Sequence, residues 1–272
     1  MDAPRTACKL ARLRSHTGPS ENAVHRGRRD RPIRTREEEA MTTIQRQARF
    51  AGLLYFLLAL IAPFGILYVQ GRVMVAGDAA ATAERLRASE GLVRLGIGSE
   101  LAHQAIAVFL VLALYRLFKP VHESLARHLV ALGALVSVPI MFVNVLNELA
   151  ALILVSGAGF LSGFESAQLD ALAYLFLKLH GHGIDVASVF WGLWLFPFGL
   201  LVVRSRFIPR VLGYLLLVAG SAYLFGAFVI LVLPSWLPVV SKFLLPLEIC
   251  EIPIIFWLLI RGARPRAADA AA

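Results

Sequence analysis

The sequence predicts an all-α protein, an integral membrane bundle of six transmembrane helices with both termini in the cytoplasm. Six separate apolar stretches are each about as long as the roughly 20 residues that a helix needs to cross a bilayer core of about 30 Å. Hydrophobic residues make up 58% of the chain, and the mean hydropathy is +0.70. Most ionisable side chains lie between the apolar stretches. Together these observations exclude a soluble globular fold.

The apolar stretches lack the two-residue alternation of barrel strands, so we expect helices, because backbone groups cannot stay unpaired in lipid. The predicted spans are 51–69, 96–118, 129–157, 183–203, 208–233 and 237–260. These spans and their loops fill the 272 residues and leave no room for a separate soluble domain. A seventh, short helix is an alternative around 162–180, where the chain is amphipathic.

The first 44 residues are interpreted as an Arg-rich disordered tail, because they have few large apolar side chains to bury. The alternatives are a basic arm that binds anionic lipid headgroups, and an upstream extension of a true start at Met41. Nucleic acid is not an expected partner, since no aromatic residues are interleaved with the arginines. The transmembrane domain is predicted over 45–262, and 263–272 is expected to be a short disordered tail.

The loops differ in their positive charge, and this difference predicts the topology. Eleven Lys and Arg residues flank one side of the spans and five flank the other. The positive-inside rule then places both termini in the cytoplasm. Arg204, Arg206 and Arg210 form one cytoplasmic loop and are expected at the level of the lipid headgroups.

Two local features are also predictable. The loop after the first span is expected to contain a short helix around Ala79–Ala88, with Asp78 as its N-cap. In the last span, Pro246 and Pro253 flank two glutamates, which predicts a bent helix beside a cavity.

Ionisable and amide side chains at membrane depth are the strongest functional pointers, since a charge in the bilayer core costs a few kcal/mol. Four of the six spans carry them, and within a span they tend to share one helix face. The predicted pocket residues are Glu100, His103, Gln104, Asn144, Asn147, Glu148, His182, Asp185, Glu248 and Glu251.

The predicted topology places most of these side chains in the outer half of the membrane, and Glu248 and Glu251 near its middle. Any one of them alone is explained as a hydrogen bond between helices, worth about 1 kcal/mol or less. As a set they predict a polar pocket that opens toward the outside and takes a small solute, an ion or a proton.

The same residues include a weak metal-binding pattern. Glu100 and His103 form a Glu-x-x-His pair, which resembles half of the ligand set of di-iron bundles. Together with His180 and His182 they are the candidate ligands of a divalent metal. No other cofactor is expected, and Ala222 and Gly226 form a small-xxx-small pair of the type also found in homo-oligomers.

The stretch from Phe190 to Leu224 has the pieces F-x-G-L-x-L-x-x-x-G and "RSRFIPRVLG" in sequence. With the arrangement from about Gln45 to Arg261, it resembles a bacterial family of multi-pass membrane proteins known as domain of unknown function 4386. The resemblance implies a six- or seven-helix inner-membrane protein, and it transfers no activity and no site residues.

Three function classes therefore stay open. The first is a transporter-like protein that uses the predicted pocket. The second is an intramembrane metal-dependent enzyme with a His/Glu site. The third is a non-catalytic membrane sensor, scaffold or lipid-binding protein. The absence of a GxxxxGK[ST] sequence argues against ATP-driven pumping by this chain alone. Between the first two classes, the sequence favours a carrier over an enzyme.

Overall fold

The structure is a computed structural model that describes residues 33–263, with side chains from Met41 on. Contacts divide the chain into two units after Ala40, and the packing discussed below is that of the second unit. Residues 1–32 and 264–272 of the predicted tails lie outside the described residues. From Ile33 to residue 44 the backbone is helical and is the first part of α2 (Ile33–Pro63).

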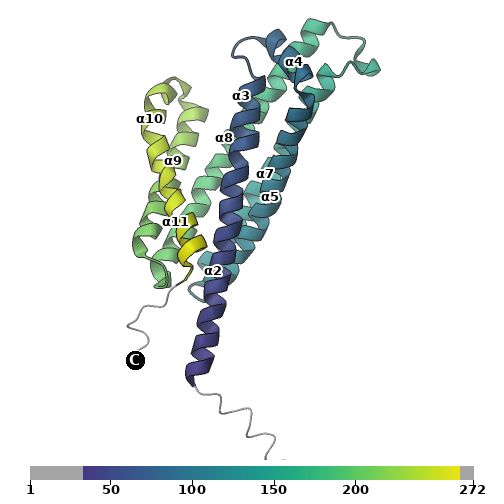
Figure 1. The fold of residues 1–272 in the computed structure, drawn as a ribbon. Helices are drawn as coiled ribbons and strands as arrows, with labels where there is room; N and C mark the ends of the chain where they lie inside the picture. The colour runs from purple at the N-terminus through teal and green to yellow at the C-terminus, as the bar shows by residue number, and fades with distance from the viewer. Residues whose placement is uncertain (1–32, 264–272) are drawn as a thin grey trace, which may run out of the picture. The chain divides into compact units, whose positions relative to one another are not determined.

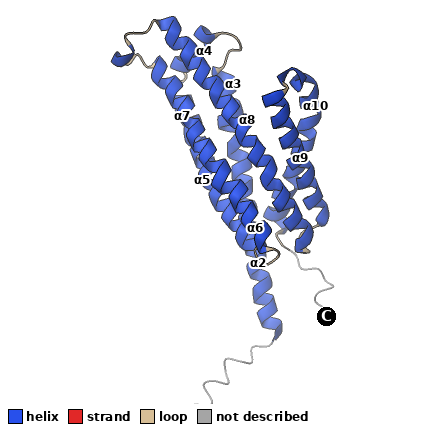
Figure 2. Ribbon diagram, turned by 180° about the vertical axis from the view of Figure 1, so that it is seen from behind, coloured by secondary structure: helices blue, strands red, loops and turns tan. Residues whose placement is uncertain are grey.

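Six helical spans are long and apolar enough to cross a membrane, which confirms the predicted fold class (Figure 1). They cover Met41–Val73, Glu90–Phe118, Glu123–Val155, Ser166–Ser205, Arg210–Val232 and Pro234–Arg261. The described residues contain no β-strand (Figure 2). Leu67, Phe109 and Leu135 are 68%, 61% and 69% exposed, as expected for side chains that face lipid tails. The chain is therefore a multi-pass membrane protein.

The spans differ in how regular they are. The second, fourth and fifth are the single helices α5 (Glu90–Phe118), α8 (Ser166–Ser205) and α9 (Arg210–Val232). The first and third each contain a π-helical segment; the first is α2, Phe64–Val69 and α3 (Gln70–Val73), and the third is α6 (Glu123–Val130), Ala131–Val136 and α7 (Ser137–Val155). The sixth runs through the turn Pro234–Trp236, α10 (Leu237–Glu248), the 3-10 turn Ile249–Glu251, α11 (Ile252–Phe256) and the π-helical Trp257–Arg261.

The sixth span is interrupted where its prolines predict. Pro246 lies within α10 and Pro253 lies in the first turn of α11. Neither can donate a backbone hydrogen bond, and a 3-10 turn that contains Glu251 separates the two helices.

The segment 162–180 does not form a separate seventh helix. From Ser166 on it is the first part of the 40-residue helix α8. Glu165 and Gln168 form a capping box that starts this helix before the chain reaches the predicted span. The short helix α4 (Ala79–Ala88) is confirmed, with Asp78 Oδ1 accepting a hydrogen bond of 2.9 Å from the backbone N–H of Ala81.

Helix α8 packs against α7 on one side and α9 on another, and glycines bring α8 and α9 into direct backbone contact. A Cβ atom on Gly192 would lie 2.9 Å from the carbonyl oxygen of Gly220, and one on Gly213 would lie 2.6 Å from that of Gly199. Small residues allow this close approach, which is a common way to join helices in membranes.

The buried apolar side chains form two cores. One core joins all six spans around Tyr55, Phe118 and Phe198. The other joins α4 to the first four spans around Leu86 and Val145. The start of the first span meets the end of the last, where Arg49 donates a hydrogen bond of 3.3 Å to the Ile260 carbonyl. Residues 49 and 260 therefore lie on the same side of the bundle.

Candidate functional site

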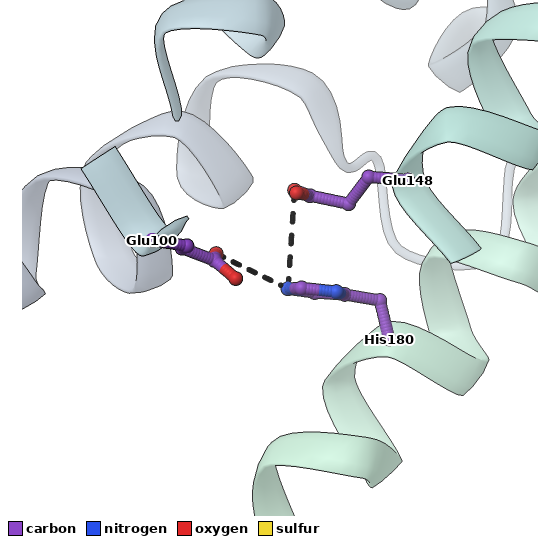
Figure 3. A group of neighbouring side chains, drawn as sticks. All are labelled: Glu100, Glu148 and His180. Atoms are coloured by element: carbon purple, nitrogen blue, oxygen red, sulfur yellow. Dashed lines mark ion pairs between the residues drawn. The ribbon is translucent and has the colours of Figure 1, made fainter. Parts of the chain in front are cut away.

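Three ionisable side chains meet inside the bundle and form what we term the triad: Glu100 on α5, Glu148 on α7 and His180 on α8 (Figure 3). His180 Nε2 lies 3.3 Å from Glu100 Oε1 and 3.8 Å from Glu148 Oε1. The three residues are only 3%, 1% and 0% exposed. Each lies one helical turn from a member of the second core, so the charges are set against packed apolar side chains.

Neighbouring polar groups fix the triad in place. Gln70 Nε2 donates a hydrogen bond of 3.1 Å to Glu148 Oε1. His180 Nδ1 lies 3.4 Å from the carbonyl oxygen of Asn144, and Asn144 Nδ2 donates to the His180 carbonyl over 2.9 Å. Asn147 in turn donates to Asn144 Oδ1 over 3.0 Å. Since a carbonyl can only accept, Nδ1 is the ring nitrogen placed to carry a proton, and the lone pair of a neutral ring then lies on Nε2.

The triad's inner atoms lack hydrogen-bond partners. Among the described residues, both oxygens of Glu100, Oε2 of Glu148 and Nε2 of His180 are buried without one. The 3.3 Å approach of Nε2 to Glu100 brings the groups together without hydrogen-bond geometry. Most buried polar atoms in folded proteins are paired, so four unpaired atoms at one point mark a place that could hold a cation.

The triad's chemistry and dimensions fit a divalent transition metal. Imidazole nitrogen and carboxylate oxygen are ligands of zinc, iron and manganese. Two ligand atoms bound tetrahedrally at about 2.1 Å are separated by about 3.4 Å, close to the 3.3 Å and 3.8 Å seen here. One ligand atom from each residue lies within 4.8 Å of the others. The backbone carbonyl at Nδ1 is the outer partner that metal-bound histidines usually have.

A separate cavity of about 450 Å³ lies among all six spans. Most of its wall is apolar. Its polar and indole-bearing lining residues are Tyr55, His103, Gln104, Ser137, Trp191, Trp194, Tyr223, Glu248 and Glu251. It adjoins the triad, because Glu100 and His103 are one turn apart on α5.

Hydrogen bonds tie some of these polar groups to each other. The Tyr55 hydroxyl donates to Glu251, joining the first span to the last. Trp191 Nε1 donates to Ser137 Oγ over 3.0 Å. Glu248 has no hydrogen bond or ion pair with any described residue and is partly exposed at the cavity wall.

The predicted pocket residues therefore fall into three places. Glu100 and Glu148 are in the triad, and Asn144 and Asn147 support it. The cavity wall holds His103, Gln104, Glu248 and Glu251. His182 and Asp185 contact each other at 3.2 Å, with the His182 side chain 60% exposed, and belong to neither group.

Of the four metal-ligand candidates, Glu100 and His180 lie in the triad with Glu148, whereas His103 faces the cavity. Sequence reasoning missed Gln70, Tyr55 and Tyr223, because it followed charged residues and treated the first and fifth spans as uncharged. A polar residue at the end of a span, such as Gln70, would have been the available signal.

The predicted headgroup residues lie at the end of the bundle where α8 joins α9. Arg204, Arg206 and Arg210 are all exposed. Arg206 ends α8 with a positive φ of 60°, which turns the chain toward α9.

The model of the family described as Domain of unknown function (DUF4386) matches residues 50–262 of this chain. No curated protein matches the chain. No solved structure matches it either. The match covers most of the chain and confirms the predicted resemblance, so the chain belongs to this family.

Proposed function

We propose that this member of the DUF4386 family binds a divalent metal ion within its membrane domain, with Glu100, Glu148 and His180 as the ligands. The observation that carries the proposal is the convergence of these three buried side chains with four unpartnered polar atoms between them. Three protein ligands leave a coordination position for water or a substrate, as in catalytic rather than structural zinc sites.

Charge balance supports a metal over a simple ion pair. Two carboxylates with a neutral imidazole carry two negative charges, which a divalent ion neutralises. A protonated His180 would neutralise only one of them and leave an uncompensated charge in a region that excludes water. It would also leave Oε2 of Glu100 and Oε2 of Glu148 without partners.

The surrounding residues would have defined roles around such an ion. Gln70 orients Glu148, and the Asn144 carbonyl fixes the ring of His180. A bound ion would supply Lewis acidity and an activated water. This chemistry supports the metal-dependent enzyme among the three function classes. It does not identify a substrate.

Metal content decides the proposal. We expect about one zinc, iron or manganese ion per chain in protein purified in detergent, measured by elemental mass spectrometry. The ion should be lost in Glu100→Gln and His180→Ala. The matched control is His182→Ala, which removes an exposed histidine two residues along the same helix. A wild type without metal, or equal metal in all variants, would overturn the proposal and leave the triad as a proton-bearing link between helices.

A carrier for a small solute, ion or proton is the second candidate, and the cavity beside the triad favours it. Counter-flow of a bound cation in proteoliposomes tests it. Flux that is lost in Glu148→Gln and kept in His182→Ala supports a carrier, whereas no flux for any cation leaves a sensor, scaffold or lipid-binding protein.

We further propose that the chain lies in a bacterial cytoplasmic membrane with both termini in the cytoplasm and with Arg204, Arg206 and Arg210 at the inner headgroups. In intact cells, a membrane-impermeant maleimide should label Glu84→Cys on α4 and should not label Arg210→Cys, in a background with Cys8 and Cys250 replaced by Ser. The reverse labelling pattern would contradict this orientation.

A further inference from the structure

The cavity described above has a chemical character that the triad does not explain. Its volume of about 450 Å³ is within the usual range for sites of drug-sized molecules. Its wall is mostly aliphatic, so an occupant must present a largely apolar body. A metal ion alone would not fill such a space.

The charge of the wall is one-sided. Glu248 and Glu251 line the cavity, and among the described residues that line it none is Lys or Arg. Glu251 has the Tyr55 hydroxyl as a hydrogen-bond donor, whereas Glu248 has no partner for its carboxylate. A carboxylate at membrane depth is costly without a counter-charge, and the described wall has no permanently charged Lys or Arg to supply one.

Aromatic rings stand beside these carboxylates. Trp191, Trp194 and Tyr223 all line the cavity. Ring faces attract organic cations, and the attraction grows when water is excluded. The Trp191 N–H is already engaged by Ser137, so this ring offers its apolar surface rather than a hydrogen bond to an occupant.

We infer that this cavity binds a lipophilic organic cation, with Glu248 as the principal counter-charge and the aromatic rings around its apolar body. An anion would face two carboxylates, and a neutral lipid would leave Glu248 unpaired. The inference does not depend on a metal at the triad.

Tetraphenylphosphonium is a suitable probe, because it is a permanent lipophilic cation without hydrogen-bond donors. Tetraphenylborate is its matched control, with nearly the same shape and the opposite charge. Binding is measured by equilibrium dialysis against purified protein in a nonionic detergent, with detergent alone subtracted. We expect saturable binding of the cation at one site per chain, and at least about tenfold weaker binding of the borate.

The decisive variant is Glu248→Gln, which keeps the size of the side chain and disturbs no hydrogen bond among the described residues. It should weaken tetraphenylphosphonium binding about tenfold. Glu84→Gln, on an exposed face of α4, is the control that removes one charge elsewhere and should leave binding unchanged. Wild-type affinity in Glu248→Gln, or equal affinity for the borate, would overturn the inference.

A chelator separates this inference from the proposed metal site. Tetraphenylphosphonium binding should persist after treatment with EDTA, and also in Glu100→Gln. If EDTA removes the metal and tetraphenylphosphonium still binds, the cavity proposal stands without the metal site. If the untreated protein holds metal and does not bind tetraphenylphosphonium, only the cavity proposal is refuted.

Discussion

The triad and the cavity are neighbours along α5, and they present opposite problems of burial. In the triad, polar groups are packed so tightly that Glu148 and His180 are 1% and 0% exposed, yet four of the inner atoms have no partner. In the cavity the side chains stand apart around about 450 Å³, and the wall is largely apolar. The triad thus gathers unpaired polar atoms, whereas the cavity is bounded mainly by apolar side chains.

The two regions are built on helices of different regularity. The triad is built on α5, α7 and α8, and two further hydrogen bonds between α7 and α8 hold its histidine. The cavity has the interrupted sixth span as one wall, where a 3-10 turn presents Glu251. Regular helices fix distances between ligand atoms, and a broken helix leaves space.

The largest expected effect is on stability at the triad. His180→Ala should lower the free energy of unfolding by about 3–5 kcal/mol, because it removes a proposed metal ligand and so leaves two buried carboxylates without the cation that it helps to hold. Glu248→Gln should not lower it, because this change removes a carboxylate that has no partner among the described residues. Unfolding in detergent with increasing dodecyl sulfate measures both. Similar losses in the two variants would erase the distinction between the regions.

The second expected effect tests Asn144, whose hydrogen bonds hold His180 in the triad. A Cβ atom on Gly183 would lie 1.9 Å from Asn144 Oδ1, so Gly183→Ala must displace the asparagine that holds His180. We expect a loss of about 1–3 kcal/mol in unfolding free energy and about tenfold weaker metal binding. The control is Gly181→Ala, since nothing lies within 4 Å of a Cβ at that position. Competition with a colorimetric chelator measures the affinity, and equal affinities in both variants would count against the assigned support.

Filling the cavity tests the other region. Ala107 lines it from α5, and Ala107→Phe should weaken tetraphenylphosphonium binding about tenfold by occupying the space. Metal content should stay at the wild-type level, because Ala107 is nearly two turns from Glu100. Dialysis and elemental analysis of the same sample check both readouts. A variant that loses metal as well would show that the two regions form one site.

The smallest effect concerns a position outside both regions. Asp78→Ala removes the N-cap of α4 and should lower the unfolding free energy by about 1 kcal/mol. Neither metal nor cation binding should change, so a thermal shift with unchanged binding gives the baseline for the other variants. Altered binding of the metal or of tetraphenylphosphonium in this variant would show that α4 is coupled to the triad or to the cavity.

The sequence was sufficient for the features that depend on local pattern. Apolar length predicts the six spans, and the residue types around Asp78 predict α4 and its cap. The grouping of the polar residues was not predictable in the same way. Helix periodicity shows that Asn144, Asn147 and Glu148 share a face, but it does not say which helix that face meets.

The histidines of the fourth span show why. His180 and His182 are two residues apart, about 200° around a helix, so only one of them can face α5 and α7. Both histidines adjoin Gly181, and the sequence does not show which of them faces the bundle, so the prediction of the pocket took His182 instead of His180. Packing decided the choice, through the contact of Gly183 with Asn144.

The glycine contacts between α8 and α9 constrain how the bundle can move. Where backbones touch at Gly192 and Gly220, and again at Gly199 and Gly213, one helix cannot slide or rotate past the other without losing both contacts. Trp191, Trp194 and Tyr223 therefore stand on a fixed side of the cavity. The Tyr55 ring lies 5.8 Å from that of Trp194, so the hydrogen bond from Tyr55 to Glu251 ties the first and last spans to this same fixed side.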